Sequence, residues 1–495
     1  MSDPRDEELN DAPEMLDAND ALEEIEDLEG DVAMDSDDDE PVEINIHNDS
    51  VAYFDAHKDS VFSIAQHPTQ PTLIATGGGE GEGDDAPGIG YVFDTSPVVG
   101  RPVLPPSYHA DPSAAQQKSI GLQPLFTIEG HTDSINALAF TLPRGEFLVS
   151  GGMDGRMRVY SLSFDAHNKA SFAFIAESQE VPEINWLVPC PVVPNSQSPV
   201  ANTIALGSSD GSVWVYTIDA SDASNPVQIV QSYFLHTESC TAGAWSPDGK
   251  FLATVSEDGS LQVWDVWGEA AAKGLTNDNG QTVVSLNASD QRFAVDGGLY
   301  SVAIDPKSSF VAVGGAGGAI KIVGLPRLST DGQPASGRPG KGRAAGAGAG
   351  GSQAGTILAD LHTQSDGIET LSFSPTNPLL AAGSVDGSIA VFDTSRRFAV
   401  RRHLKEAHEE FSIVKVEFIR GTGDGWLLTS CGMDGVVRRW DLRGAAGVAA
   451  ESMVKEWRGH RGDGEGGGVL GFVQGSTGER IVTAGDDGIV LVFEA

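Results

Sequence analysis

Residues 235–266 read LHTESCTAGAWSPDGKFLATVSEDGSLQVWDV, and this stretch decides the fold. A histidine turn at His236 is followed by three short apolar segments, which predict strands. The last two segments are separated by Asp258-Gly259, and an Asp-Gly pair suits a hairpin turn that needs a positive φ. The stretch ends on an aromatic residue and an acid, Trp264-Asp265. It therefore predicts antiparallel strands joined by tight turns.

The same pattern recurs from about residue 50 onward. Together with 235–266, the copies that make up eight units lie at 56–96, 130–162, 204–218, 299–325, 361–395, 407–442 and 459–495. A single unit of this size cannot bury both of its apolar faces. Stacking neighbours in a ring buries both faces and leaves only short edges exposed.

This pattern resembles the WD-repeat family, because Gly-His, Asp-Gly and Trp-Asp elements recur in the right order. The resemblance implies an all-β fold, an eight-bladed WD-repeat β-propeller over residues 50–495 with four antiparallel strands per blade. It also implies that the aspartate of the Asp-Gly turn bonds the histidine of the same blade. The residues assigned to these structural turns are His57, His131, Asp154, Asp210, His236, Asp258, His362, Asp386, His408, Asp434, His460 and Asp487.

The two ends of the repeat region predict how the ring closes. The last strand, Ile489–Phe493, is a third strand, and only Glu494 and Ala495 follow it. A strand at about Ser50–Phe54 precedes the first histidine turn. We expect this N-terminal strand to complete the last blade and to remove an open sheet edge.

Charge divides the chain into an acidic tail and an acidic propeller. Residues 1–50 hold 21 acidic residues and one basic residue, a charge of −20, so half of the net charge of −40 belongs to the rest. We expect residues 1–41 to be a disordered acidic tail. Disordered insertions are also expected at about 97–123, 267–291 and 326–355, all leaving from the bottom of the ring.

Composition also bounds the partners and the compartment. An acidic protein repels nucleic acid and anionic membranes, so we expect a basic protein partner and no direct nucleic-acid contact. The three cysteines form no CxxC pair, which fits a reducing compartment. No apolar run is long enough to span a membrane. We therefore expect a cytoplasmic monomer, with access to the nucleus left open.

Enzyme signatures are missing from the sequence. The glycine-rich stretches lack GxxxxGK[ST], no HExxH is present, and the turns account for the histidines. We therefore expect a protein that is not an enzyme and that has no catalytic residue, no metal site and no cofactor.

The binding residues are read from positions that face the channel at the top of WD propellers, in the loops before the first strand and between the second and third. The acids and aromatics at or beside these positions are Glu183, Glu257, Glu369, Asp486, Asp366, Glu410, Phe62 and Tyr300. Carboxylates and aromatic faces suit arginine and lysine side chains. Loop acids also simply keep a surface soluble. For the set as a whole, we favour a cation-binding top face.

One basic stretch departs from this acidic character, between Arg396 and Lys405 on the link into an outer strand. It either protects an exposed sheet edge by its charge or contacts RNA or a second partner. Because the stretch is isolated in an acidic protein, we favour edge protection.

The first repeat, AHKDSVFSIAQHP (56–68), and the last segment, TAGDDGIVLVFEA (483–495), extend the resemblance. With the acidic tail and eight repeats, they are similar to the angio-associated migratory cell protein family. Its fungal branch contains ribosome-assembly factors that act as dedicated chaperones of large-subunit ribosomal protein ten (uL-sixteen). The resemblance implies capture of that protein's basic N-terminal segment on the acidic top face. The alternative is a general WD-repeat scaffold, such as a signalling or ubiquitin-ligase adaptor.

Overall fold

The computed structural model describes residues 48–81, 86–98, 119–191, 201–328, 354–421, 425–444, 452–461 and 467–495. The expected tail 1–41 lies outside this part, as do most of the insertions at 97–123 and 326–355. The described residues form strands and short 3₁₀ turns, and no helix among them could cross a membrane. The 3₁₀ turns are η1 (Ser96–Val98), η3 (Ala271–Lys273), η4 (Ala316–Gly318) and η5 (Thr394–Arg396).

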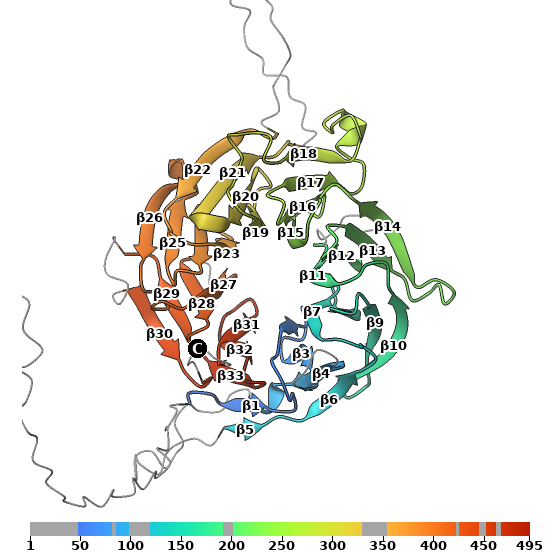
Figure 1. Cartoon of the computed structure of the whole chain (residues 1–495). Coiled ribbons are helices and arrows are strands. Elements are labelled where there is room, and N and C mark those ends of the chain that lie inside the picture. Colours follow the sequence, from blue (N-terminus) through green and yellow to red (C-terminus); the bar gives the residue numbers. More distant parts are fainter. Residues whose placement is uncertain are drawn as a thin grey trace, which may run out of the picture. The chain divides into compact units, whose positions relative to one another are not determined.

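The strands form eight antiparallel blades in a ring, as the repeats predict, and each blade runs outward from its first strand (Figure 1). Blade 1 contains β2 (Ser63–Gln66), β3 (Leu73–Gly79), β4 (Gly88–Asp94) and β6 (Pro124–Ile128). Blade 2 contains β7 (Ile135–Phe140), β8 (Phe147–Gly152), β9 (Met157–Phe164) and β10 (Ala170–Ser178). Blade 3 contains β11 (Ile184–Pro189), β12 (Thr203–Ser208), β13 (Val213–Ile218) and β14 (Val227–Tyr233). Blade 4 contains β15 (Cys240–Trp245), β16 (Phe251–Ser256), β17 (Leu261–Asp265) and β18 (Thr282–Leu286).

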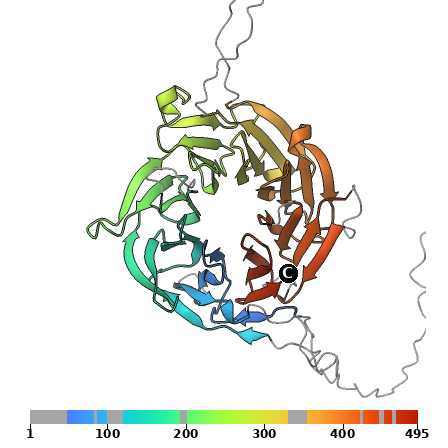
Figure 2. The ribbon, with the colours of Figure 1, turned by 180° about the vertical axis from the view of Figure 1, so that it is seen from behind.

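The second half of the ring repeats this order (Figure 2). Blade 5 contains β19 (Leu299–Ile304), β20 (Phe310–Gly315), β21 (Ala319–Gly324) and β22 (Ile357–His362). Blade 6 contains β23 (Ile368–Phe373), β24 (Leu379–Ser384), β25 (Ile389–Asp393) and β26 (Ala399–Leu404). Blade 7 contains β27 (Ile413–Phe418), β28 (Leu427–Gly432), β29 (Val437–Asp441) and β30 (Met453–Trp457). Blade 8 contains β31 (Val469–Val473), β32 (Arg480–Gly485), β33 (Val490–Glu494), β1 (Ala52–Phe54) and β5 (Ile120–Gly121).

The core lies between the blades rather than at the centre of the ring. The buried apolar side chains of the described residues fall into eight clusters, and each cluster joins two neighbouring blades. The second strand of a blade is covered by neighbours on both faces, so strands such as β16 and β24 are buried at every residue. Small residues recur in these strands, as in LLAAGS of β24, because the blades approach closely there.

The ring closes as predicted, by pairing an N-terminal strand with the last one. β1 lies antiparallel to β33, with Ala52 opposite Val492 and Phe54 opposite Val490. The Phe54 ring is buried and stacks on Phe93 of blade 1, with 4.6 Å between the ring centroids. The closing strand therefore completes blade 8 and also packs against blade 1.

A fifth strand on blade 8 was not predicted. β5, from the connection between β4 and β6, pairs in parallel with β1, and Ser119 Oγ lies 2.9 Å from Ser50 Oγ. These residues fall at the end of the expected insertion 97–123. Because β5 covers β1, the closing strand is not the free edge of its sheet.

Most turn histidines bond as the repeat pattern implies. Nδ1 of His131, His408 and His460 lies 2.9–3.1 Å from Asp154, Asp434 and Asp487, respectively. The ring of His236 is held by Ser260 Oγ at 2.7 Å and lies 4.0 Å from Asp258. Burial lowers the pKa of His236 to about 4, so this ring is neutral at physiological pH.

Two turn residues have no His–Asp bond. His57 keeps the bond that the other turn histidines make through Nε2, here to Thr76 Oγ1 at 2.9 Å, but its blade has a glycine-rich loop where the Asp-Gly turn would stand. Asp210 holds its own turn, accepting hydrogen bonds from the backbone and hydroxyl of Ser212 at 2.9 and 2.6 Å. Both residues therefore stabilise turns without a His–Asp bond.

The assignment of His362 to a turn is wrong. His362 is exposed on β22 and pairs with Asp360, whereas Gln364 fills the buried turn position and donates to the carbonyl of Ser388 at 2.8 Å. Two extra residues separate His362 from the next strand, so the histidine falls out of register. Asp386 instead accepts four hydrogen bonds from Ser365 and Ser388. Although burial alone raises the pKa of Asp386, these bonds hold it at about 2.

The expected disorder of residues 267–291 also needs correction. This stretch holds η3 and the outer strand β18, in which Thr282 and Val284 are buried. Because most of this stretch is polar, its short segment TVVSL was not recognised as a strand, although it completes blade 4. Blade 5 is a regular four-stranded blade in which η4 replaces the Asp-Gly turn, with positive φ at Gly317 and Gly318.

Shortening the chain tests ring closure. Removal of residues 1–41 keeps β1, so the melting temperature is expected to stay unchanged. Removal of residues 1–55 exposes the edge of β33 and is expected to lower the melting temperature sharply or to prevent folding. The milder substitution Phe54→Ala is expected to cost about 3–5 kcal/mol of unfolding free energy, measured by chemical denaturation. A large fall in melting temperature on removing residues 1–41 alone would show that the closing strand lies earlier in the chain than β1.

Asp434 provides a second test, because it lies between two buried partners. It bonds His408 and accepts a short hydrogen bond from Arg438, which also pairs with Glu456 at 2.9 Å. Asp434→Ala leaves the buried Arg438 cation underpaired, so we expect a loss of about 3–5 kcal/mol of unfolding free energy. The matched control is Asp210→Ala, which removes only local turn bonds and is expected to cost about 1 kcal/mol. Equal losses for the two variants in urea titrations would show that the buried network adds nothing.

Candidate functional site

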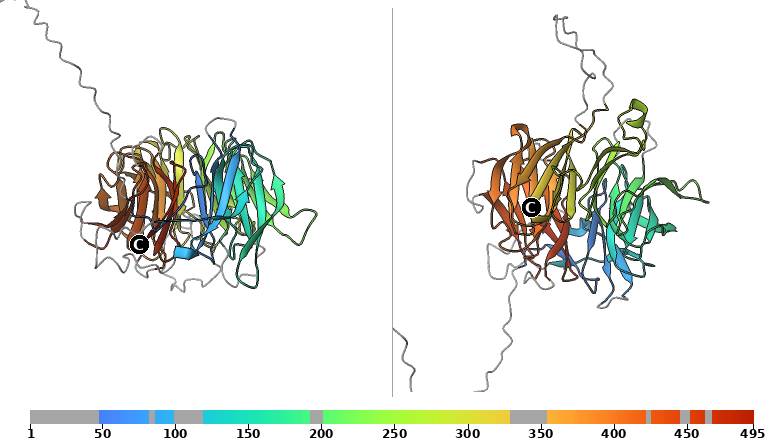
Figure 3. Two further views of the ribbon diagram at one scale, coloured as in Figure 1. Left: turned by 90° about the horizontal axis from the view of Figure 1, so that it is seen from below. Right: turned by 45° about the horizontal axis from the view of Figure 1, so that its top comes forward.

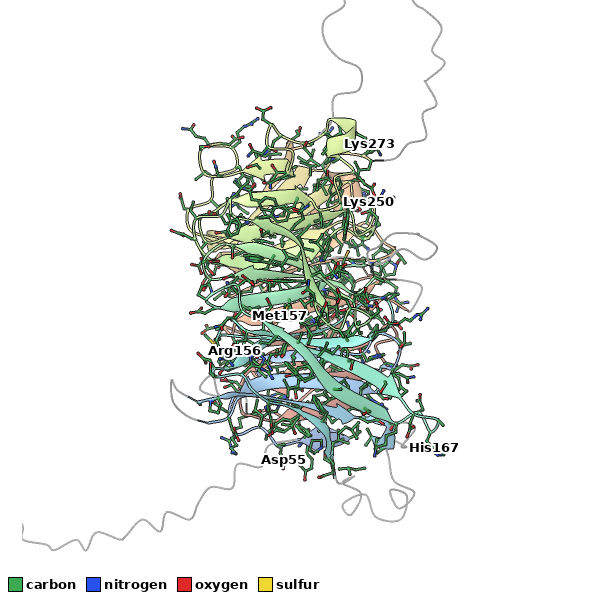
Figure 4. All side chains as sticks on the ribbon, turned by 90° about the vertical axis from the view of Figure 1, so that its right-hand side faces the viewer. Asp55, Arg156, Met157, His167, Lys250 and Lys273 are labelled. Atoms are coloured by element: carbon green, nitrogen blue, oxygen red, sulfur yellow. The ribbon has the colours of Figure 1, made fainter. Side chains whose placement is uncertain are left out.

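The two faces of the ring are built from different loops. The loops before each innermost strand and between the second and third strands form one face, here called the top face. The strands run from one face of the ring to the other, so the remaining connections lie on the opposite face, here called the bottom face (Figure 3). In the edge-on view, Arg156 of a top turn lies on the opposite side from His167, Lys250 and Lys273 of bottom connections (Figure 4).

A repeated β-bulge shapes the mouth of the central channel. In blades 2 to 8, the pairing of the innermost strand with the next strand skips the second residue of the innermost strand. A bulge re-aims the side chain of the unpaired residue. With Phe62, which directly precedes β2, the mouth ring in blade order is Phe62, Asn136, Asn185, Thr241, Tyr300, Glu369, Val414 and Leu470.

Four of the predicted binding residues come together over blades 4 to 6. Gly298 lies between Glu257 and Tyr300, since a Cβ there would be 2.9 Å from Glu257 Cα and 3.1 Å from Tyr300 Cε1. A Cβ on Gly367 would be 3.4 Å from Glu369 Oε1 and 3.7 Å from Tyr300 Cδ2. The residues Glu257, Tyr300, Asp366 and Glu369 therefore form one continuous surface, here called the acidic sector.

The electrostatics of the acidic sector favour a bound cation. Partial desolvation and the nearby charge of Asp366 raise the pKa of Glu369 above its usual range, although the residue stays exposed to solvent. The ionised form of this carboxylate is therefore destabilised in the free protein. An arginine or lysine side chain would relieve that cost by charge-assisted hydrogen bonds.

The remaining predicted acids lie apart from this sector. Glu183 is exposed on the loop before β11, and its backbone carbonyl accepts a hydrogen bond from the N–H of Ser209. The carboxylate of Asp486 accepts a hydrogen bond from Ser60 Oγ at 2.6 Å. Glu410 lines a separate cavity of about 450 Å³ together with Glu406, Glu409 and His403. The structure therefore gathers only part of the predicted set.

Phe62 lies in a partly apolar pocket of the mouth that the sequence pattern did not predict, and the lining also holds the polar residues Asn136 and Asn185. With 42% of its surface exposed, it lines an open cavity of about 450 Å³ in the channel, here called the channel pocket. The other apolar residues of its lining include Ile64, Leu138, Trp186, Leu470 and Phe472. All of them stand on innermost strands, and this shared place in the repeats is the signal that could have revealed them.

A lysine also stands in the channel, one residue beyond the mouth ring of blade 7. The Lys415 ammonium donates to the carbonyl of Phe472 at 2.8 Å, pairs with Glu417 at 3.0 Å and lies 4.7 Å from the Phe472 ring centroid. Lys415 makes the two sides of the channel electrostatically different.

Two arginines of the basic stretch from Arg396 to Lys405 pack between blades. Arg402 is buried and donates to Ser452 and to the carbonyl of Gly444, while Arg401 lies over the Trp426 ring at 4.7 Å. These arginines tie β26 to blade 7. Arg396, Arg397 and Lys405 stay exposed, and for them edge protection remains a prediction.

The blades, their turns and the channel mouth define a WD-repeat β-propeller. The family model described as WD domain, G-beta repeat, matches residues 122–161, 227–265 and 355–393. Each match starts on the outer strand of one blade and ends on the third strand of the next. Among the described residues, no group of three His, Cys, Asp or Glu side chains is placed to hold a metal ion.

Comparison with known proteins narrows the class. The chain is 62% identical to Sqt1 of Chaetomium thermophilum, solved bound to the N-terminus of the ribosomal protein L10, over 91% of this chain and 100% of that one, with a TM-score of 0.77. It is 27% identical to the ribosome assembly protein SQT1 of Saccharomyces cerevisiae, over 94% of this chain and 93% of the relative. It is 23% identical to the human angio-associated migratory cell protein, over 90% and 80% of the two chains. The chain belongs to the Sqt1 family of WD-repeat proteins.

Proposed function

We propose that this protein is a ribosome assembly factor, a dedicated chaperone that binds the N-terminal segment of newly made ribosomal protein L10 on its top face. The observation that carries the proposal is the 62% identity to a Sqt1 protein solved with the L10 N-terminus bound. This partner agrees with the one expected from the sequence, large-subunit ribosomal protein ten.

The geometry supplies a physical reason for this role. A ribosomal protein carries basic surface that pairs with RNA in the ribosome, and before assembly that surface is unpaired. The acidic sector offers carboxylates and the Tyr300 ring in place of RNA phosphates. The acidic character of the whole chain speeds capture of a basic segment by long-range electrostatic attraction. Salt screens this attraction, with a Debye length of about 8 Å at physiological ionic strength.

The proposal extends to the other predicted top-face residues and to the cellular setting. Glu183, Asp486 and Glu410 lie outside the acidic sector and are proposed to steer the client rather than to clamp it. Binding, not catalysis, is the proposed activity. We place it in the cytoplasm, where L10 is made, with access to the nucleus left open.

Charge reversal in the acidic sector tests the function. Glu369→Lys puts a cation where a client cation would bind, so affinity for an L10 N-terminal peptide is expected to fall at least tenfold, about 1.4 kcal/mol. Isothermal titration calorimetry measures it. The matched control is Asp222→Lys, the same charge change at an exposed site between β13 and β14, on the bottom face.

The outcomes separate three explanations. Equal losses in both variants, with unchanged melting temperatures, would mean that only net charge matters. No binding of the L10 peptide by the unmodified chain would overturn the proposal. In pulldowns from cell extract, one dominant ribosomal protein that is lost at high salt supports the chaperone, whereas a mixed and salt-resistant set of partners supports a general scaffold.

The raised pKa of Glu369 predicts a pH dependence. A bound cation stabilises the ionised carboxylate, so binding lowers this pKa. Affinity is therefore full above the pKa of the free protein and falls as the pH drops through it. We expect weaker peptide binding at about pH 5 than at neutral pH, and a flatter pH profile for Glu369→Gln. An identical profile in this variant would assign the pH dependence to other groups.

A further inference from the structure

The mouth ring has two chemically different sides. Tyr300 and Glu369 stand on blades 5 and 6, inside the acidic sector, while Leu470 and Phe62 stand on blades 8 and 1. In an eight-bladed ring, blades 5 and 1 lie opposite each other across the channel (Figure 1). A client segment that crosses the mouth therefore meets carboxylates on one side and apolar side chains on the other.

The channel pocket on the apolar side is large enough for a side chain. Its volume of about 450 Å³ is within the range of about 300–1,000 Å³ that is usual for small-ligand sites. The Phe62 ring is 42% exposed, and an exposed aromatic residue inside a concave surface gains most when a partner covers it. The pocket thus offers apolar area that the free protein leaves in water.

One wall of the channel pocket is fixed before any ligand arrives. The Trp186 indole donates to the carbonyl of Cys240 at 3.1 Å. It lies flat over two glycines, since a Cβ on Gly207 or Gly243 would come within 2.3 Å of the indole. A rigid wall lowers the ordering cost of binding.

The charges around the channel pocket disfavour a cation as its occupant. No carboxylate is among the described residues that line it. The Lys415 ammonium lies 4.7 Å from the centroid of the Phe472 ring, which forms part of the lining. A second positive charge here would be repelled by this ammonium, and the unpaired acceptor in the lining, Asn136 Oδ1, is a neutral amide rather than a carboxylate.

We infer that the channel pocket receives a large apolar or aromatic side chain of the L10 N-terminal segment while the acidic sector holds a cationic one. This inference rests on the proposed function and assigns a second subsite to the same face. The acidic sector attracts any polycation, whereas the pair of subsites demands a cation and an apolar group in one segment. The channel pocket is therefore the specificity-determining part of the face.

The test compares Phe62→Ala with the unmodified full chain. For an L10 N-terminal peptide, Phe62→Ala is expected to weaken binding at least tenfold, with the salt dependence of the affinity unchanged because no charge is lost. For an oligoarginine of the same length, the two proteins are expected to bind equally. The matched control is Phe174→Ala, which removes a 50% exposed aromatic residue from the outer strand β10 and is expected to alter neither affinity.

A double-mutant cycle then locates the occupant. Alanine is placed in turn at each large apolar or aromatic residue of the peptide, and one of these changes is expected to lose its effect in the Phe62→Ala protein. Unchanged L10 affinity in Phe62→Ala overturns the inference and leaves the proposed function standing. An equal loss with oligoarginine also overturns it, because Phe62 would then bind a cation. If the unmodified chain does not bind the L10 peptide, both proposals fail.

Discussion

The antiparallel pairing of β1 with β33 decides whether the eight blades can form a ring at all. Every core cluster joins two neighbouring blades, so no blade has a core of its own. An open arc would leave two blade faces bare, whereas a closed ring leaves none. Because β1 completes blade 8 while Phe54 stacks on Phe93 of blade 1, this one strand supplies both the missing sheet edge and a contact across the junction.

Closure also gives the binding face its geometry. Once the ring is closed, the innermost strands converge, and one bulge residue from each of blades 2 to 8 arrives at the channel mouth. The bulge is a property of the backbone and repeats in these blades, while its side chain is free to differ. The side chains at these seven positions, and at Phe62 in blade 1, can therefore differ in chemistry without disturbing the core. This explains how carboxylates and apolar groups coexist around one opening.

The fold was predictable because the repeat carries its own signals. Most of the turn residues, the eight units and the closing strand were predicted from local sequence patterns, and the structure contains them. What failed depended on register: His362 lies two residues from the turn position that Gln364 fills, and TVVSL of β18 is too short to stand out from its polar surroundings.

The candidate site was predictable only in part. Glu257, Tyr300, Asp366 and Glu369 occupy positions that the repeat fixes, so the sequence placed them on one face. Their mutual proximity depends on the rotation of each blade relative to the next, which a linear pattern does not contain. The same holds for the channel pocket, whose lining comes from blades far apart in sequence, and for Lys415, which lies one position beyond the positions that were read.

The parallel strand β5 has a mechanical consequence. β5 pairs with β1 along the edge opposite β33, and it belongs to the connection that leads from the third to the outer strand of blade 1. Extracting β1 from between its two neighbours breaks two strand ladders, whereas peeling off an edge strand would break only one. Interactions that must all be lost before unfolding proceeds raise its barrier, so the lifetime of the folded state is governed by a rate as well as by an equilibrium. Under the proposed function, this arrangement holds the ring closed while a client segment is bound to the top face.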